Sequence, residues 1–292
     1  MPPALPHVPG VDHEDVSVRG LRRHVAFAGP ADGAPVLLHH GWPQHWYAWR
    51  HLIPELAGAG HRVIVPDSRG FGWSEYPPDD DFSHAAFVDD VLALCEALDL
   101  DRVSYVGHDW GCWFGFLLAL GHPGLVKRAA LMSAPHPWLP PPAPDLETVA
   151  RFSRMAYQVA IASPTPPGPL KPALFQLIAQ AAHGERFSEP DLDAYLAPLS
   201  QPSQQRASTL LYRNTLLREM LPIARGAHAG ERLTMPVLYM IGDRDPLFDE
   251  EAVNALPSHG DDVRTEVIRG AGHFLPEEAP DLVRDQLLSF LA

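Results

Sequence analysis

The chain has 292 residues, 46% of them hydrophobic, and a formal net charge of −14. This length and composition suit one large globular domain, or a core domain with an insertion, and they argue against disorder. The negative charge argues against nucleic acid or an anionic membrane as a partner, because either would need a basic face.

The first residues show neither the basic segment nor the apolar segment of a secretory signal. The longest apolar run, 112–120, is too short to span a bilayer. Cys95 and Cys112 both fall in expected helices, where we expect them to pack as small apolar groups rather than to form a disulfide. A cytoplasmic protein is therefore the default expectation.

Short apolar runs rich in β-branched residues alternate with longer runs of helical periodicity, which predicts βαβ units and a mostly parallel sheet. The expected strands are 14–18, 21–27, 35–40, 62–66, 102–106, 126–132, 235–242 and 263–268. The expected helices outside the middle of the chain are 46–56, 82–98, 112–120, 250–256 and 277–291.

The alternation stops between the sixth and seventh strands. Two proline-rich breakers lie there, at 135–144 and 164–169, and the remaining residues predict helices at 145–162, 170–182, 189–199 and 201–220. We therefore expect a core domain formed by residues 1–134 and 233–292, interrupted by an all-helical cap domain of residues 135–232.

The pentapeptide Gly107-His108-Asp109-Trp110-Gly111 joins the fifth expected strand to a buried helix. It has the frame G-x-S-x-G of a nucleophile elbow, with Asp109 in the serine position. A carboxylate exposed on such a turn can attack an electrophilic carbon and form an ester. The alternative for Asp109 is a helix N-cap, a position that aspartate favours.

Two further side chains follow later strands and could serve Asp109. His273 lies after a Gly-Ala-Gly loop and could activate water, while Asp245 follows the seventh strand and could orient the His273 ring. Asp243 is the rival acid, and either aspartate could simply be a turn residue before Pro246. His273 by itself would be read as a surface loop residue.

The segment His40-Gly41-Trp42-Pro43 follows the third expected strand. The backbone N–H groups of Trp42 and Trp110 could form an oxyanion hole there, although a plain turn explains the same residues. His39, His40, His108 and His136 are expected to be hydrogen-bonding or structural residues, because no metal-ligand spacing occurs.

These segments, 40–43, 66–74, 107–111 and 272–273, resemble the α/β-hydrolase superfamily, and within it the epoxide hydrolases with an aspartate nucleophile. The resemblance covers essentially the whole chain. It implies an α/β fold with a mostly parallel eight-stranded sheet flanked by helices and a helical cap after the sixth strand. The order Asp109, Asp245, His273 matches the nucleophile–acid–histidine order of that superfamily.

Epoxide hydrolases of this type carry two cap tyrosines that bind the epoxide oxygen, and Tyr157-Gln158 and Tyr212-Arg213-Asn214 fall at the matching places. The resemblance thus implies that Asp109, Asp245, His273, Tyr157 and Tyr212 are catalytic, and that Trp42, Trp110 and both tyrosines bind substrate. For either tyrosine alone, a helix residue packing at an interface is an equally good interpretation. No metal or organic cofactor is implied.

The expected substrates are a small apolar epoxide and water, giving a vicinal diol through an aspartyl ester. One alternative is a haloalkane or haloacid dehalogenase that uses the same nucleophile, and another is a non-catalytic ligand-binding protein of the same fold. A homodimer is compatible with the sequence but not indicated by it. Six apolar residues could line the pocket or belong to the core: Phe71, Trp73, Trp138, Phe152, Phe175 and Leu211.

Overall fold

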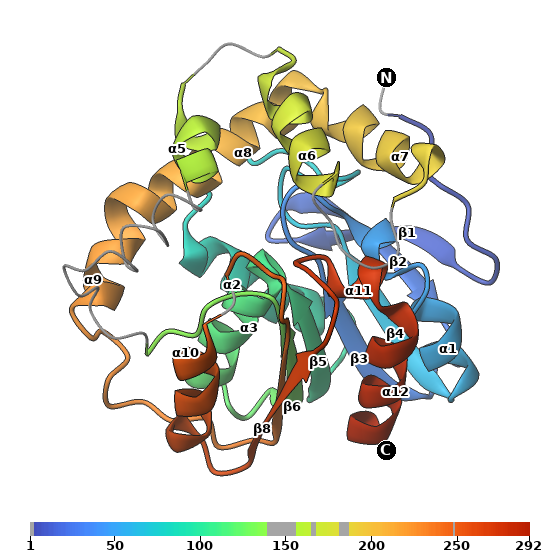
Figure 1. Cartoon of the computed structure of the whole chain (residues 1–292). Coiled ribbons are helices and arrows are strands. Elements are labelled where there is room, and N and C mark those ends of the chain that lie inside the picture. Colours follow the sequence, from blue (N-terminus) through green and yellow to red (C-terminus); the bar gives the residue numbers. More distant parts are fainter. Residues whose placement is uncertain (1–2, 139–155, 165–167, 181–186, 248) are drawn as a thin grey trace.

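An eight-stranded sheet forms the centre of the computed structural model, in the order β1-β2-β4-β3-β5-β6-β7-β8 (Figure 1). The structure describes residues 3–138, 156–164, 168–180, 187–247 and 249–292. The strands are β1 (Asp12–Val18), β2 (Leu21–Ala28), β3 (Ala34–His39), β4 (His61–Pro66), β5 (Val103–His108), β6 (Val126–Met132), β7 (Val237–Gly242) and β8 (Val263–Ile268). β2 is antiparallel to β1 and β4, and every other neighbouring pair is parallel. The predicted mostly parallel sheet is confirmed.

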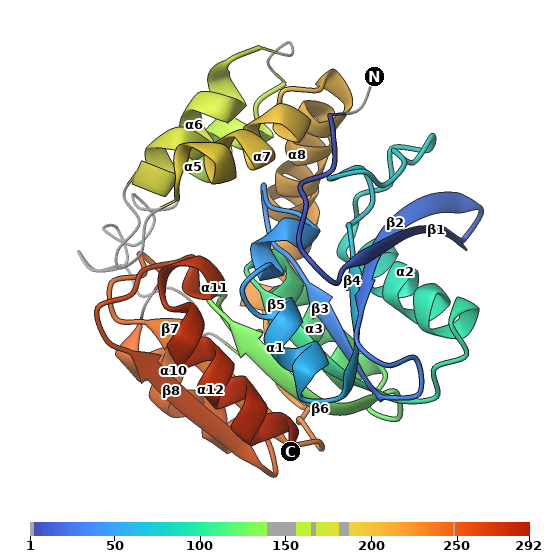
Figure 2. The same cartoon turned by 90° about the vertical axis from the view of Figure 1, so that its right-hand side faces the viewer.

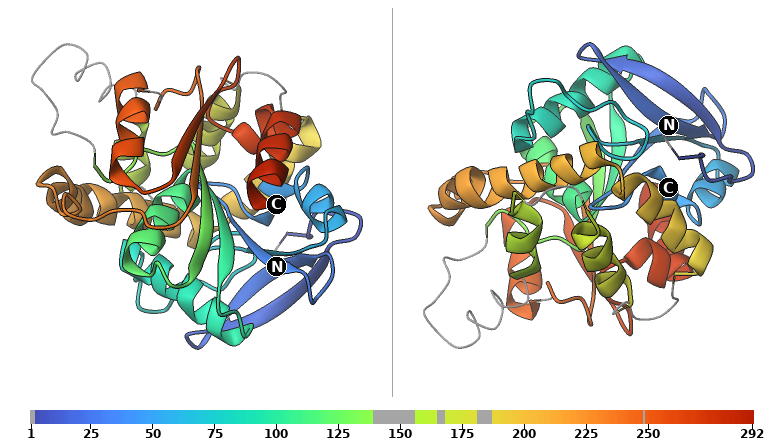
Figure 3. Two further views of the ribbon diagram at one scale, coloured as in Figure 1. Left: turned by 90° about the horizontal axis from the view of Figure 1, so that it is seen from below. Right: turned by 90° about the horizontal axis from the view of Figure 1, so that it is seen from above.

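Helices cover both faces of the sheet (Figure 3). One face packs against α1 (Ile53–Gly58) and α12 (Pro280–Leu291), and the other against α2 (His84–Ala97), α3 (Trp110–Gly121) and α10 (Glu250–Ala255). β5 is buried along its whole length between these layers. The strand that leads to Asp109 is therefore enclosed by both helical layers.

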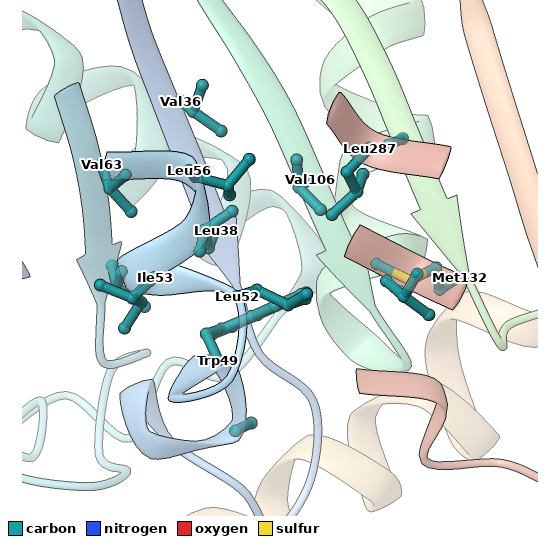
Figure 4. Close-up of a cluster of buried hydrophobic side chains, with 14 of the residues drawn as sticks. Val36, Leu38, Trp49, Leu52, Ile53, Leu56, Val63, Val106, Met132 and Leu287 are labelled. Atoms are coloured by element: carbon teal, nitrogen blue, oxygen red, sulfur yellow. The ribbon is translucent and has the colours of Figure 1, made fainter. Parts of the chain in front are cut away.

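The packing against α1 and α12 follows the two-residue period of the strands, since alternate side chains point to the same face. Val36 and Leu38 of β3 lie beside Val106 of β5 on this face, and Leu56 of α1 and Leu287 of α12 cover them (Figure 4). All five side chains are essentially excluded from water. Their burial anchors the carboxyl ends of the central strands, where ligands of parallel sheets bind.

The described residues between β6 and β7 include a group of helices that lies across one end of the sheet (Figure 2). They are α5 (Ala156–Ala162), α6 (Leu170–Gln180), α7 (Glu189–Leu199), α8 (Pro202–Asn214), the π-helical turn η2 (Thr215–Glu219) and α9 (Met220–Ala224). Leu211 and Tyr212 of α8 pack with Trp42, which follows β3, and with Phe114 of α3 in one buried hydrophobic cluster. The first part of the expected helix 145–162, with its N-cap at Asp145, lies outside the described residues.

Three expected helices are interrupted, and proline accounts for the breaks. The segment 46–56 forms a 3₁₀ turn η1 (Trp46–Trp49) before α1, because Pro54 has no N–H to continue a helix from the preceding turn. The segment 277–291 likewise divides into α11 (Leu275–Glu278) and α12, which begins at Pro280. The segment 201–220 changes from α to π geometry at Thr215, ahead of Pro222, whose ring would otherwise press on the carbonyl of residue 218.

Candidate active site

Asp109 occupies a tight turn between β5 and α3, with φ of 53° and ψ of −118°. This is the left-handed half of backbone space, which costs an aspartate about 1–3 kcal/mol and persists only where surrounding contacts enforce it. The turn also requires glycine on both sides, since a Cβ at Gly107 would lie 2.3 Å from the Gly111 carbonyl oxygen and one at Gly111 would lie 2.0 Å from that of His39. Asp109 stands at the N-cap position of α3, but its side chain makes no capping hydrogen bond, so capping does not account for the aspartate.

The Asp109 carboxylate is held from the neighbouring loop. The Trp42 backbone N–H donates to Asp109 Oδ1 at 2.7 Å, and the neighbouring Trp110 backbone N–H helps to lower the pKa of the carboxylate. Gly41 is required for this approach, because a Cβ there would lie 2.2 Å from Oδ1. Burial raises the pKa of Asp109, but the hydrogen bond and charge of His273 outweigh it, so the pKa lies below its usual value. The carboxylate is therefore ionised.

His273 lies between β8 and α11 and reaches both acids. Its Nδ1 is 3.0 Å from Asp245 Oδ2, and its Nε2 is 3.4 Å from Asp109 Oδ2. Asp245 is buried, and its other oxygen accepts the Leu247 N–H at 2.8 Å. Burial lowers the pKa of His273, but Asp245 and Asp109 more than reverse this effect, so its pKa is raised well above the usual value.

The rival acid Asp243 is used elsewhere. Its Oδ1 accepts the Gly270 backbone N–H at 2.7 Å, and its Oδ2 lies 3.6 Å from the exposed Arg269 guanidinium. Asp243 thus ties the β7 turn to the β8 turn, and the structure pairs His273 with Asp245.

The four other histidines singled out from the sequence bond to neighbouring protein atoms. His39 bonds Tyr105 and Ser68, His40 accepts the Ser68 N–H, and His136 donates to the Ala252 carbonyl at 2.9 Å. His108 donates to the His273 carbonyl at 2.7 Å. Among the described residues no group of three or more His, Cys, Asp or Glu side chains is arranged to hold a metal ion.

A cavity opens above Asp109 and is bounded by both predicted tyrosines. Its lining is mostly apolar and comprises Asp109, Trp110, Trp113, Ala134, Pro135, His136, Tyr157, Gln158, Tyr212, Thr215, Met220, Ile223 and Leu247. A second, smaller cavity lies on the His273 side and is lined by Trp42, Pro43, Asp109, Tyr157, Phe175, Ile178, Tyr212, His273 and Phe274. Asp109, Tyr157 and Tyr212 border both cavities, so they lie where the two meet.

Burial raises the pKa of both Tyr157 and Tyr212, and the Asp109 charge adds to this effect. Both phenols are therefore protonated at neutral pH and can donate. The Tyr212 ring lies edge-on to the rings of Trp42 and Trp110, with centroids 5.5 and 5.2 Å away. These contacts fix the Tyr212 ring over the elbow.

The two tryptophans differ in how their indole N–H groups are used. Trp42 Nε1–H donates to Ser208 Oγ at 2.8 Å, so Trp42 presents its backbone N–H and its ring to the site. Trp110 Nε1 is buried and has no hydrogen bond of normal geometry within the described part of the chain. It borders the cavity.

Of the apolar residues predicted to line the pocket or belong to the core, some line a cavity and others do not. Phe175 lines the smaller cavity, and Phe71 and Leu211 line a small space beside Trp42 and Trp110. Trp73 packs in the core, Trp138 stacks on His259 with centroids 4.7 Å apart, and Phe152 lies outside the described residues.

Several lining residues were not predicted from the sequence: Trp113, His136, Thr215 and Leu247. A local signal existed for Thr215, which follows Tyr212 by three residues and so shares its helix face. Leu247 follows the predicted acid Asp245 by two residues, but no feature of the sequence indicates that Leu247 lines the cavity. The other two depend on tertiary packing.

Comparison with known proteins places this architecture in a family. Residues 34–280 match the model of the alpha/beta hydrolase fold. The chain therefore belongs to the α/β-hydrolase fold family.

Within that family its relatives include enzymes of two kinds. The chain is 32% identical to a soluble epoxide hydrolase from Corynebacterium sp. (strain C12), over 97% of this chain and 98% of the relative. It is 30% identical to a haloalkane dehalogenase from Psychrobacter cryohalolentis, over 98% of this chain and 92% of the relative. The structure of the epoxide hydrolase CorEH is 29% identical and superposes with a TM-score of 0.79 over 96% of this chain and 98% of that one.

Proposed function

We propose that this protein is an epoxide hydrolase that converts a small apolar epoxide to a vicinal diol through a covalent ester on Asp109. The observation that carries the proposal is the placement of an ionised carboxylate beneath two protonated phenols in a largely apolar cavity. A phenol can polarise the ring oxygen and then give it a proton, which a strained ether requires and a halide does not.

In the first step Asp109 attacks one epoxide carbon. Oδ1 already accepts the Trp42 N–H, so Oδ2 is the attacking atom. A new C–O bond forms to Oδ2, the ring C–O bond breaks, and the ring oxygen takes a proton from Tyr157 or Tyr212. The product is a hydroxyalkyl ester of Asp109.

In the second step His273 first gives its resting proton to the phenolate left by ring opening. The neutral imidazole then removes a proton from water, and the resulting hydroxide attacks the ester carbonyl carbon. Asp245 holds the His273 ring and stabilises its positive charge. The oxyanion that develops on the former Oδ1 accepts hydrogen bonds from the backbone N–H groups of Trp42 and Trp110. As this intermediate collapses, the bond between the carbonyl carbon and Oδ2 breaks and the diol oxygen takes the proton that His273 removed from water. The new carboxyl then passes its own proton to His273, which regenerates the Asp109 carboxylate.

The division into domains belongs to the same proposal. Residues 1–134 and 233–292 form the hydrolase core, and 135–232 form a cap that contributes Tyr157 and Tyr212. The cavity between the two supports this division, because the core contributes Asp109 and Trp110 to its lining and the cap contributes Gln158, Thr215 and Met220. No described helix is both long and apolar enough to cross a membrane. A cytoplasmic location remains part of the proposal.

A dehalogenase is the second candidate, because the indole N–H next to the nucleophile has no hydrogen bond of normal geometry to any described residue. Trp110 Nε1–H could bind a departing halide. The indole N–H of Trp42 already donates to Ser208, so it does not serve as a second donor to a halide. This favours an epoxide over a haloalkane as the substrate.

The deciding experiment is a panel of aliphatic and aryl epoxides together with haloalkanes, assayed for diol and for halide, with Asp109→Asn as the inactive control. Diol formation that depends on Asp109 supports the proposal. Halide release without diol would replace it with dehalogenation, and binding without turnover would favour a non-catalytic receptor.

A further inference from the structure

We propose that Glu278 is a positioning residue for His273, fixing the backbone on both sides of the histidine so that its ring can serve the hydrolytic step. The inference rests on the proposed function, because it assigns a part in the second half of that reaction. Its basis is a buried carboxylate that bonds the two peptide groups flanking His273.

Glu278 is the last residue of α11 and is 3% exposed. Its Oε2 accepts the Gly272 N–H at 2.7 Å, and its Oε1 accepts the Phe274 N–H at 2.8 Å. The turn of α11 brings the side chain back to this loop, since the Glu278 N–H itself donates to the Phe274 carbonyl at 2.8 Å. One carboxylate therefore spans the residues immediately before and after His273.

The peptide carbonyl of His273 is also held by hydrogen bonds. It accepts His108 Nε2–H at 2.7 Å and the Leu275 N–H at 3.1 Å. Burial lowers the pKa of His108 to about 4, so this imidazole is neutral at neutral pH and keeps a single donor for the carbonyl. With both neighbouring N–H groups and its own carbonyl engaged, His273 keeps freedom mainly in its side-chain torsions.

The loop needs such an external anchor. It contains Gly270, with φ of 80°, and Gly272, and glycine confers backbone freedom that the ordered loop must give up. Hydrogen bonds from N–H groups to a carboxylate are stronger than those to a neutral acceptor, so one buried glutamate can fix both peptides. The His273 ring must keep its Nδ1 bonded to Asp245 while its Nε2 accepts a proton from water near Asp109. A displacement of about 1 Å can reduce a reaction rate about 10²-fold.

The chain supplies a matched control next to Glu278. Glu277 is equally buried, but its carboxylate bonds side chains, namely Tyr195, Gln44 and Arg50, rather than the His273 loop. Glu277→Gln therefore removes a buried carboxyl group from the same helix without touching the two peptide anchors.

The test compares Glu278→Gln with Glu277→Gln in single-turnover reactions of an epoxide that the wild type hydrolyses. In Glu278→Gln we expect ester formation on Asp109 to proceed near the wild-type rate and ester hydrolysis to slow about 10²-fold, so that the ester accumulates. In Glu277→Gln the ratio of the two rates should match the wild type even if its melting temperature falls. Equal slowing of both steps in Glu278→Gln, or an unchanged ratio, overturns the proposal.

A readout without substrate separates this inference from the proposed function. The Nδ1 proton of His273, bonded to Asp245, should give a downfield proton resonance in the wild type that broadens or disappears in Glu278→Gln and persists in Glu277→Gln. Persistence in Glu278→Gln refutes the positioning role even if no epoxide is a substrate, whereas absence of diol from the wild type refutes only the proposed function. If Glu278→Gln does not fold, Glu278→Asp, which keeps the charge on a shorter side chain, must show the same selective effects.

Discussion

Replacing His273 with glutamine should separate the two halves of the proposed reaction. His273 is the sole imidazole placed between the Asp109 carboxylate and a buried acid in the described structure, with Nε2 3.4 Å from Asp109 and Nδ1 3.0 Å from Asp245. A general base of this kind accelerates its step about 10²- to 10⁴-fold, which corresponds to about 3–5 kcal/mol of barrier. Ester hydrolysis should slow by that factor in His273→Gln.

Ring opening should survive the same substitution. Asp109 loses the hydrogen bond and charge of His273 that lower its pKa, but it keeps the N–H groups of Trp42 and Trp110. The glutamine amide can still donate to Asp245, so that buried acid need not be left without a partner. The ester should therefore form in one turnover and then persist.

Intact-mass spectrometry measures this directly. His273→Gln mixed with an epoxide should gain the mass of one epoxide, and peptide mapping should locate it on Asp109. In a single wild-type turnover in H₂¹⁸O, the label should enter the Asp109 carboxylate and the first diol should be unlabelled, because water attacks the carbonyl carbon. Asp109→Asn should form no adduct. Label in the first diol, or no adduct on His273→Gln with a substrate that the wild type hydrolyses, would refute a covalent route.

Three further predictions concern the same site. Tyr157→Phe and Tyr212→Phe should each lower kcat/KM for diol formation by roughly 10²-fold, because a proton donor to the ring oxygen is lost, and the double variant should form no measurable ester. Asp109→Asn should lower the pKa of His273, measured by ¹⁵N NMR titration, since a charge that raises it is removed. The raised pKa of His273 stabilises the folded protein, fully below about pH 6.5, and this stabilisation is lost as the pH rises through the pKa that His273 has in the folded protein. The free energy of unfolding of Asp109→Asn should therefore fall less than that of the wild type over this pH range. Gly41→Ala should abolish ester formation while a Val36→Ile control in β3 retains it, because the added Cβ would lie 2.2 Å from Asp109 Oδ1.

The sequence predicts the sheet and the elbow because both depend on local chemistry. The Gly107 and Gly111 frame requires small residues wherever it folds, and apolar runs of strand length leave few alternatives for β5. The positions of two helix breaks could also be predicted from the sequence. Pro54 and Pro280 mark them, since a proline cannot donate the hydrogen bond that a continuous helix needs.

Other features depend on contacts between segments far apart in the chain. The choice between Asp243 and Asp245 is decided by which carboxylate meets the β8 loop and which meets His273, and the two lie only two residues apart. The commitment of the Trp42 indole to Ser208 joins residues 166 positions apart. Glu278 gives no sequence signal, because a glutamate at a helix end is usually exposed.

The charges of the site suggest why the two proposed steps occur in order. In the resting site both Asp109 and Asp245 raise the pKa of His273, against the opposing effect of burial, so the imidazole is protonated and cannot act as a base. The same ion pair keeps Asp109 ionised and ready to attack. Ester formation removes the Asp109 charge, and with it one of the two causes that raise the pKa of His273. The pKa of His273 must then fall, because Asp109 no longer opposes the effect of burial. The imidazole can give its proton to the phenolate left by ring opening and then activate water. A base that becomes available only after the nucleophile has reacted would protect the epoxide from premature attack by hydroxide. Asp109→Asn carries no charge at this position, as in the ester, so it shows the change in the pKa of His273 in the free enzyme.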